Sequence, residues 1–497
     1  MKMLKNFPVI IFILFFSAIL GATVYYAPGW GLMDDCQNLG RASAVLHSPS
    51  PVQEFLKNVW GDAIGWGIFR PVYHLWIITV YNLFARMPTA IYILMALINM
   101  CSLLIWGRVF CSFYNVKKEN SQLGAYLFPL SFFLFTPFWN IFMYISLQEK
   151  FVVLFSALSF YFFKKSYEVA SNRLVPFTFL FLILGLFSKP TTLCLALVYI
   201  VFALLDCLLF KIRPALSLVY LAISGILAVA YTTFTFKIQI HGQYTASYGH
   251  NLKPMILIGK ILAANLIIKF LFLLGIVSVL FHIIKFILTK DKNDVFGVLL
   301  PLGLLGFLTL LMPWGYQSYL LCDLAPFVLG IFFPLYIWLI GRNTFSRCSV
   351  NAAFLVLISA VLIGLILPRI SKMGEITKTE DFLKSRSLQY RHSRYLLLPP
   401  YSESAYALNG FTSEDIAYLA DGKIDETFLT DKGNNYLLVN DQCSKIRMNG
   451  VRLAEEIYSN KTWQIYSLAI DKNYTGEFKP LFKNNLIQEI KTTLRNL

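Results

Sequence analysis

The sequence contains little charge for its length. Of its 497 residues, 14% are charged, whereas 57% are hydrophobic and 16% are aromatic. Soluble domains carry about 25% charged residues, so this composition excludes an ordinary soluble protein and indicates an integral membrane protein. Acidic residues are the scarcer kind, with 27 Asp and Glu against 43 Lys and Arg. The basic residues punctuate apolar runs instead of forming one patch, which argues against nucleic-acid binding and is typical of cytoplasmic loops.

Cysteine motifs are also absent. The eight cysteines include no CxxC pair, and most of them lie in or beside apolar runs. We therefore expect neither a disulfide framework nor a zinc site.

Long apolar runs divide the first 368 residues into membrane spans. We predict about eleven spans, at roughly 7–27, 89–110, 123–143, 149–163, 174–187, 191–206, 215–236, 266–288, 295–312, 320–340 and 350–368. The first run is long enough to span and ends in aromatic residues instead of a cleavage site, so we expect a retained span. Basic residues concentrate in the loops that this count assigns to the cytoplasm. The sequence thus predicts a multi-pass plasma (inner) membrane protein with a cytoplasmic N-terminus and an extracytoplasmic C-terminal domain.

Two apolar segments, 174–206 and 70–86, are not predicted to be single membrane spans. Ser188-Lys189-Pro190 interrupts the apolar stretch 174–206, and a central charge followed by proline favours a hairpin over one long span. The segment 70–86, in the outer loop 28–88, is apolar, but Arg70, His74 and Tyr81 fall within about 40° of one another on a helical projection. We therefore predict an interfacial amphipathic helix that lies flat and begins at Pro71.

The composition changes after residue 368. Apolar runs shorten and charges of both signs return over residues 369–497, which predicts a small soluble α/β domain. The alternating runs at 436–439 and 463–466 indicate strands, and 480–495 indicates a closing helix. This segment contains no catalytic motif that we can identify.

Asp34 and Asp35 are the most informative acidic residues of the first 368, which contain only eleven carboxylates. They are adjacent and lie just beyond the first span, where neighbouring carboxylates raise one another's pKa. A metal, a positively charged partner or proton-transfer chemistry would explain the pair. The alternative is a solvated loop in which an aspartate caps a short helix.

Other polar residues are expected on the same outer face. Arg70 has the shape to bind a phosphate through two hydrogen bonds, or it extends to the lipid headgroups. Glu149 and Lys150 begin the fourth predicted span, and Lys189 lies at the hairpin tip. A polar and aromatic run that includes Tyr316, Gln317 and Tyr319 leads into the tenth span. His74 is a lone histidine, which does not indicate a metal ligand.

Five short motifs within residues 1–340 resemble the GT-C membrane glycosyltransferases, closest to the branch of bacterial polytopic sugar transferases and O-mannosylating membrane proteins. They are Asp34-Asp35, Trp60-Gly61, Phe69-Arg70-Pro71, Glu149 and Leu186-Phe187-Ser188-Lys189-Pro190. In that branch the first outer loop begins with an acidic pair, an aromatic-Arg-Pro sequence closes it, and a Ser-Lys-acid sequence marks the later hairpin. Here Pro190 replaces that acid, and the C-terminal domain lies outside the resemblance.

The resemblance implies a transferase that takes a sugar from a polyprenyl-phosphate carrier and places it on an acceptor, with inversion. The acceptor would be an envelope glycan, a glycolipid or a protein at the outer membrane face. Asp34 is then the expected general base, and Asp35 orients it or helps to bind a divalent cation. Some members of the superfamily use such a cation, Mg²⁺ or Mn²⁺ being the candidates here, and others do not.

The same resemblance assigns the substrate-binding residues. Positive charge near the departing lipid phosphate is expected from Arg70, Lys150 or Lys189. The remaining expected binding residues are His74, Glu149, Tyr316, Gln317 and Tyr319.

Three other functions stay open. A transporter or flippase for lipid-linked glycans also has many spans, although such proteins usually carry ionisable groups inside spans and matching broken helices. A polysaccharide polymerase or ligase typically has working arginines in a large late outer loop, and the loop at 237–252 contains none. A non-enzymatic scaffold would place the function in the C-terminal domain.

Overall fold

The structure is a computed structural model. It describes residues 7–27, 34–66, 68–84, 87–134, 148–239, 266–291, 294–311, 321–341 and 344–371, residues 374 and 378, and strands at 394–397, 416–418, 436–440, 451–459 and 464–470. The predicted helix at 480–495 and the run with Tyr316, Gln317 and Tyr319 lie outside the described residues. The chain divides into two compact units. The first comprises Met1–Thr23 and Arg41–Pro368, and the second Val24–Gly40 and Arg369–Leu497.

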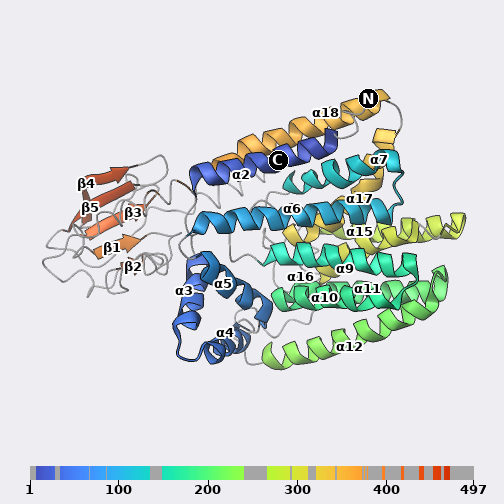
Figure 1. Ribbon diagram of the computed structural model, residues 1–497, viewed down its shortest axis with the longest axis horizontal. Helices are drawn as coiled ribbons and strands as arrows, with labels where there is room; N and C mark the ends of the chain where they lie inside the picture. The colour runs from blue at the N-terminus through green and yellow to red at the C-terminus, as the bar shows by residue number, and fades with distance from the viewer. Residues whose placement is uncertain are drawn as a thin grey trace. The chain divides into compact units, whose positions relative to one another are not determined.

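The first unit is a bundle of apolar helices that run largely side by side (Figure 1). Its long helices are α2 (Phe7–Tyr26), α6 (Pro88–Phe113), α9 (Glu149–Val169), α10 (Val175–Ser188), α11 (Leu193–Leu205), α12 (Pro214–Gln239), α15 (Leu266–Thr289), α16 (Leu299–Leu311), α17 (Leu321–Gly341) and α18 (Thr344–Val361). The short helix α7 (Lys118–Gln122) precedes the third predicted span, which begins with the π-helical turn η1 (Leu123–Leu127) and the 3₁₀ segment η2 (Phe128–Leu134). Short helical turns complete the order: η3 (Asn172–Leu174), η4 (Pro190–Thr192), η5 (Asp206–Phe210), η6 (Asp294–Val298) and η9 (Leu362–Ile366).

Seven helical segments of the described residues are long and apolar enough to cross a membrane. Large apolar side chains on them are exposed, for example Ile226 (70%), Leu288 (79%) and Val356 (71%). Such exposure is costly in water and is expected when lipid surrounds the helices. The protein is therefore a polytopic helical membrane protein, as predicted, while the count of eleven spans stays a prediction.

Aromatic side chains fill the centre of this bundle. Phe163 of α9 stacks on Tyr199 of α11 with ring centroids 4.6 Å apart. Trp106 of α6 is fully buried, and its indole N–H donates a 2.9 Å hydrogen bond to the backbone oxygen of Val153. Gly107 lets α6 pack closely against η1, because a Cβ atom at this position would collide with the backbone oxygen of Ala125. These contacts fix α6, α9 and α11 relative to one another.

The hairpin predicted at Ser188-Lys189-Pro190 is present. Helix α10 ends at Ser188, and Lys189 has an extended backbone with φ −152° and ψ 125°. Proline disfavours helical geometry in the residue before it, which explains why the helix stops at this point. Pro190 then begins the turn that leads into α11, so Lys189 lies at the hairpin tip.

Three shorter helices lie between α2 and α6 in the sequence. They are α3 (Asp34–His47), α4 (Pro51–Trp66) and α5 (Pro71–Phe84). Helix α5 corresponds to the interfacial helix predicted at 70–86 and begins at Pro71, whose missing N–H is not needed in a first turn. Its 14 residues span about 21 Å, too short for the roughly 30 Å hydrocarbon core.

The polar stripe of α5 packs against protein. His74 is buried and bonds to α4, and the Tyr81 hydroxyl donates a 2.9 Å hydrogen bond to Ser43 of α3. The apolar side chains of Leu75 and Leu83 are instead exposed. This arrangement is expected for a helix that turns its apolar side toward lipid. That α5 lies flat in the membrane surface stays a prediction.

The second unit contains a five-stranded mixed sheet with the strand order β2-β1-β3-β5-β4. The strands are β1 (Arg394–Leu397), β2 (Ile416–Tyr418), β3 (Tyr436–Asn440), β4 (Val451–Ser459) and β5 (Gln464–Ile470). Strands β2, β1 and β3 are parallel, whereas β5 is antiparallel to both β3 and β4. The two strands predicted from alternating side chains correspond to β3 and β5.

Candidate functional site

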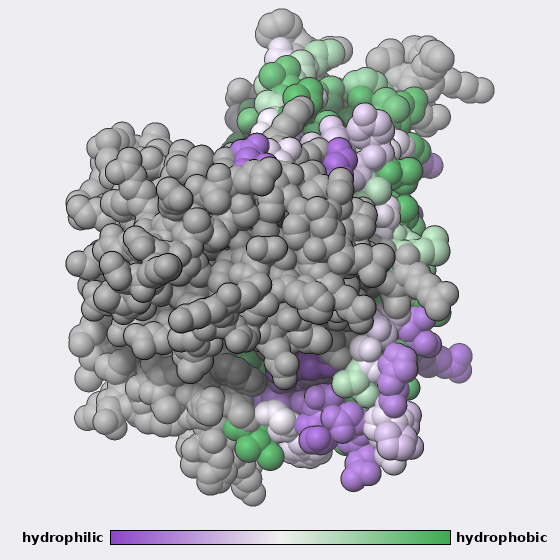
Figure 2. Space-filling view, turned by 90° about the vertical axis from the view of Figure 1, so that its left-hand side faces the viewer, coloured by the Kyte–Doolittle hydropathy of each residue, from purple (hydrophilic) through white to green (hydrophobic). Residues whose placement is uncertain are grey.

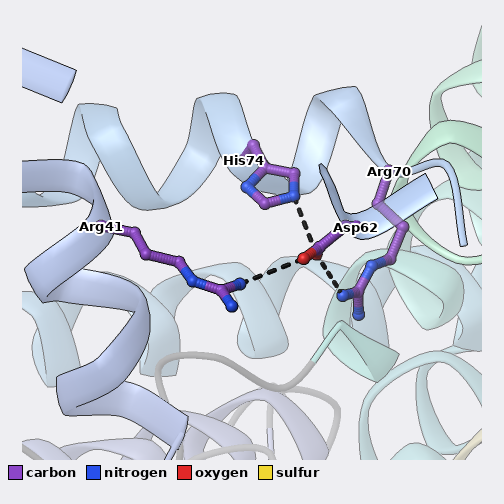
Figure 3. A network of polar contacts seen from close by, with 4 residues as sticks. All are labelled: Arg41, Asp62, Arg70 and His74. Atoms are coloured by element: carbon purple, nitrogen blue, oxygen red, sulfur yellow. Dashed lines mark hydrogen bonds and ion pairs between the residues drawn. The ribbon is translucent and has the colours of Figure 1, made fainter. Parts of the chain in front are cut away.

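Four side chains form a cluster centred on the carboxylate of Asp62 (Figure 3). Arg41 of α3 and Arg70, just before α5, approach this carboxylate from opposite sides. Their guanidinium nitrogens lie 3.1 Å and 2.8 Å from Asp62 Oδ1 and Oδ2, respectively. His74 Nε2 lies 3.0 Å from Oδ2, so this ring nitrogen carries the proton that the carboxylate accepts. We call these residues the Asp62 cluster.

The Asp62 cluster carries more positive than negative charge. Burial of Asp62 acts to raise its pKa, but the hydrogen bond from His74 and the charge of Arg70 outweigh this effect. The pKa of Asp62 consequently falls from 3.8 to about 2, and the carboxylate is ionised at neutral pH. Two guanidinium groups against one carboxylate leave a surplus of at least one positive charge. Arg70 also has a buried Nε atom without a hydrogen-bond partner among the described residues.

A second cluster joins three helices through the ammonium group of Lys189. Lys189 Nζ lies 2.6 Å from Glu149 Oε1 at the start of α9 and 2.8 Å from Asp323 Oδ2 at the start of α17. The side chains of Glu149 and Asp323 are 4% and 0% exposed. Thr191 donates a longer 3.4 Å hydrogen bond to Asp323 Oδ2. We call Glu149, Lys189 and Asp323 the Lys189 cluster.

Aromatic contacts join the segments that carry the two clusters. Phe69, next to Arg70, contacts Phe187, two residues before Lys189, with ring centroids 5.8 Å apart. Trp76 of α5 contacts Phe151 of α9 at 5.1 Å. Lys150 Nζ lies 5.7 Å from the Trp76 ring centroid. The clusters are therefore neighbours at the end of the bundle where α9 and α17 begin and α10 ends.

Figure 2 views the molecule from the left-hand side of Figure 1. Among the residues coloured in this view, most hydrophilic ones lie at the lower right and many hydrophobic ones lie in the upper part. A surface that is polar in one part and apolar in another is expected where a protein meets both water and lipid.

The structure brings together four of the predicted site residues. Arg70 and His74 belong to the Asp62 cluster, and Glu149 and Lys189 to the Lys189 cluster. Lys150 is buried against Trp76. Glu149 is also buried, and it accepts a hydrogen bond from Lys189. The functional roles of these residues stay predictions.

The acidic pair lies at the start of a helix. Asp34 and Asp35 form the first turn of α3, but their side chains lie outside the described part of the structure. The roles predicted for them in catalysis and in metal binding therefore remain predictions. Among the described residues, no group of three His, Cys, Asp or Glu side chains could hold a metal ion.

Sequence reasoning missed Arg41, Asp62 and Asp323 as members of these clusters. Asp62 was one of four acids in the first outer loop, and only its spacing before Arg70 and His74 distinguished it. Asp323 supplies an acid that contacts Lys189, although Pro190 occupies the position where the resembling family has one. The contact joins residues 134 positions apart, so no local sequence pattern indicates it.

Comparison with solved structures finds a structural likeness. No protein-family model matches the chain, and no curated protein matches it. Among solved structures, it is similar to the crystal structure of ArnT from Cupriavidus metallidurans bound to undecaprenyl phosphate, with a TM-score of 0.43 and 10% sequence identity. The match covers 93% of this chain and 98% of that chain.

Proposed function

We propose that this protein is a membrane glycosyltransferase of the GT-C type. It would move a sugar from a polyprenyl-phosphate donor to an envelope glycan, a glycolipid or a protein at the outer membrane face, with inversion at the anomeric carbon. The observation that carries the proposal is the positive surplus of the Asp62 cluster, beside helices that cross the membrane.

A lipid-linked phosphate has the chemistry that this cluster would bind. Arg70 is held by Asp62 through one terminal nitrogen, which leaves its Nε donor for a second partner. A guanidinium group binds phosphate through paired N–H donors, and desolvation strengthens such contacts. Asp62 would hold Arg41 and Arg70 in place before the ligand arrives, since their mutual repulsion otherwise separates them.

The proposed reaction needs one carboxylate base and a stabilised leaving group. The acceptor hydroxyl oxygen would form a bond to the anomeric carbon while its proton passes to the base, for which the sequence favours Asp34. The bond from the anomeric carbon to the phosphate oxygen breaks, and its electron pair leaves with the lipid phosphate. Arg70 and Arg41 would stabilise that increase in negative charge.

Binding of the bare lipid phosphate tests this proposal. The purified full-length protein in lipid nanodiscs should bind a polyprenyl phosphate, and Arg70→Ala should weaken binding at least tenfold. Arg70→Lys keeps the charge but lacks the planar fork, so an intermediate loss is expected. Lys57→Ala is the matched control, because Lys57 is on α4 but is 76% exposed. If the wild type and a folded Arg70→Ala variant bound the lipid phosphate with equal affinity, the proposal that the Asp62 cluster binds this phosphate would be refuted.

Sugar transfer distinguishes the enzyme from a transporter. Membranes that contain the protein should transfer a radiolabelled sugar from the polyprenyl-phosphate donor to an acceptor. In cells without the gene, mass spectrometry should detect envelope glycans that lack one sugar. A flippase would move the lipid across the bilayer and leave its sugar attached. Transport without any transfer would therefore refute the glycosyltransferase proposal.

A further inference from the structure

The Lys189 cluster leaves two buried oxygen atoms without hydrogen-bond partners. One oxygen of each carboxylate contacts Lys189, whereas Glu149 Oε2 and Asp323 Oδ1 have no partner among the described residues. A carboxylate oxygen that leaves water without gaining a hydrogen bond is costly. Two such atoms on facing carboxylates indicate that a hydrogen-bond donor from outside the cluster belongs here.

The cluster has a net negative charge when both carboxylates are ionised, which also favours a ligand that donates hydrogen bonds. Glu149 and Asp323 contribute two negative charges when ionised, and Lys189 contributes one positive charge. The ligand that completes the cluster must therefore donate hydrogen bonds. A metal ion fits less well, because the described residues contain no group of three possible metal ligands.

The position of the cluster narrows the chemistry of the ligand. Ring contacts of Phe69 with Phe187 and of Trp76 with Phe151 join the segments that carry the two clusters. In a lipid-linked sugar, the hydroxyl groups lie within a few bonds of the phosphate. A donor whose phosphate is held at Arg70 would extend its sugar past these rings. Aromatic faces and carboxylate oxygens are suitable partners for the C–H and O–H groups of a sugar.

We propose that Glu149 and Asp323 bind the hydroxyl groups of the transferred sugar and thereby select the sugar-bearing donor over the bare lipid phosphate. Lys189 is a positioning residue that holds the two carboxylates at the distance at which both can accept hydrogen bonds. The inference rests on the proposed function, and it adds a sugar subsite to the phosphate site.

Paired binding measurements test this inference. The purified full-length protein in nanodiscs is titrated with a polyprenyl phosphate and with the same lipid phosphate carrying glucose, mannose, galactose or a pentose. At least one sugar-bearing lipid should bind about tenfold more tightly than the bare lipid. Glu149→Gln and Asp323→Asn should each remove most of that advantage, because an amide replaces an ionised acceptor, and they should leave the affinity for the bare lipid unchanged.

A matched control separates this effect from a general loss of charge. Glu168 lies at the opposite end of α9 and also contacts a lysine, Lys165, at 2.6 Å, but its side chain is 33% exposed. Glu168→Gln should preserve the preference for the sugar-bearing lipid. Because Asp323→Asn or Glu149→Gln could disturb folding, unaltered affinity for the bare lipid serves as the internal test of a folded protein.

The outcomes separate the two proposals. If the wild type binds no polyprenyl phosphate, the proposed function fails, and the sugar subsite fails with it. If the wild type binds the bare lipid but gains nothing from any sugar, or if the preference survives in both variants, only the sugar subsite is refuted. A variant that weakens both lipids equally would show a structural role for the cluster and would also refute the subsite.

Discussion

Replacement of Lys189 by methionine should strongly destabilise the helical unit. Methionine has a similar length and fills the space with an apolar side chain, so the main loss is the ammonium group. That group contacts two carboxylates whose side chains are at most 4% exposed. Without it, the like charges of Glu149 and Asp323 would remain buried without a compensating cation.

The size of this destabilisation can be estimated from the distances between Lys189 Nζ and the two carboxylates. Unit charges 2.6 to 2.8 Å apart attract by about 6 kcal/mol at an effective dielectric constant of roughly 20, and desolvation offsets most of this. Removal of one partner from a buried ion pair typically destabilises a protein by about 3–5 kcal/mol, because the remaining charge stays buried. We expect Lys189→Met to lower the free energy of unfolding by that amount.

Unfolding in mixed detergent micelles, followed by tryptophan fluorescence, measures the effect. Lys165→Met is the control, since Lys165 Nζ also lies 2.6 Å from a carboxylate oxygen but its side chain is 40% exposed. Exposed pairs contribute about 0–1 kcal/mol, so the control should change little. The triple variant Lys189→Met, Glu149→Gln and Asp323→Asn should recover part of the loss, because it removes the uncompensated charges as well. A loss below about 1 kcal/mol in Lys189→Met, or no recovery in the triple variant, would refute the reasoning.

Three further predictions concern other parts of the chain. Asp62→Asn should lower the free energy of unfolding by about 2 kcal/mol at pH 7, given the pKa change from 3.8 to about 2. Since a lowered pKa stabilises the fold only above the unfolded value, the difference between wild type and variant should stay constant above about pH 4 and shrink toward pH 2. Asp34→Asn should abolish sugar transfer in membranes while the protein stays inserted. Asp35→Asn should reduce transfer less, unless a cation bridges both acids. Near-normal transfer by both variants would mean that the two aspartates only begin a helix. Reporter fusions should place residues 117, 290 and 497 inside, inside and outside, and a cytoplasmic C-terminus would overturn the predicted topology.

Features with a local cause could be predicted from the sequence. The first span was expected at 7–27 and is found at Phe7–Tyr26, because a continuous apolar run has one structural solution in lipid. The break at Lys189 follows from Pro190, whose ring constrains the residue before it. Strands β3 and β5 were visible in the alternation of apolar and polar side chains.

The partners of the charged residues could not be predicted in the same way. A helical projection of 70–86 showed that His74 and Tyr81 share a face, but it could not show that α3 and α4 cover this face. The Lys189 cluster depends on the packing of α9, α10 and α17, and that packing is set by many apolar contacts far apart in sequence. Periodicity indicates which side of an element is polar, whereas the neighbour that meets it is decided by the tertiary fold.

The two clusters differ in net charge, and this difference has a physical consequence for a ligand that contacts both. The Asp62 cluster has a positive surplus, and the Lys189 cluster has a negative one when both of its carboxylates are ionised. A sugar phosphate is anionic at one end and rich in hydroxyl donors at the other, so it would be favoured in only one orientation. The reversed ligand would place its phosphate against Glu149 and Asp323, where like charges repel most strongly because little water screens them. On the proposed function, this polarity would present the anomeric carbon in a fixed direction, which is the condition that an inverting displacement requires.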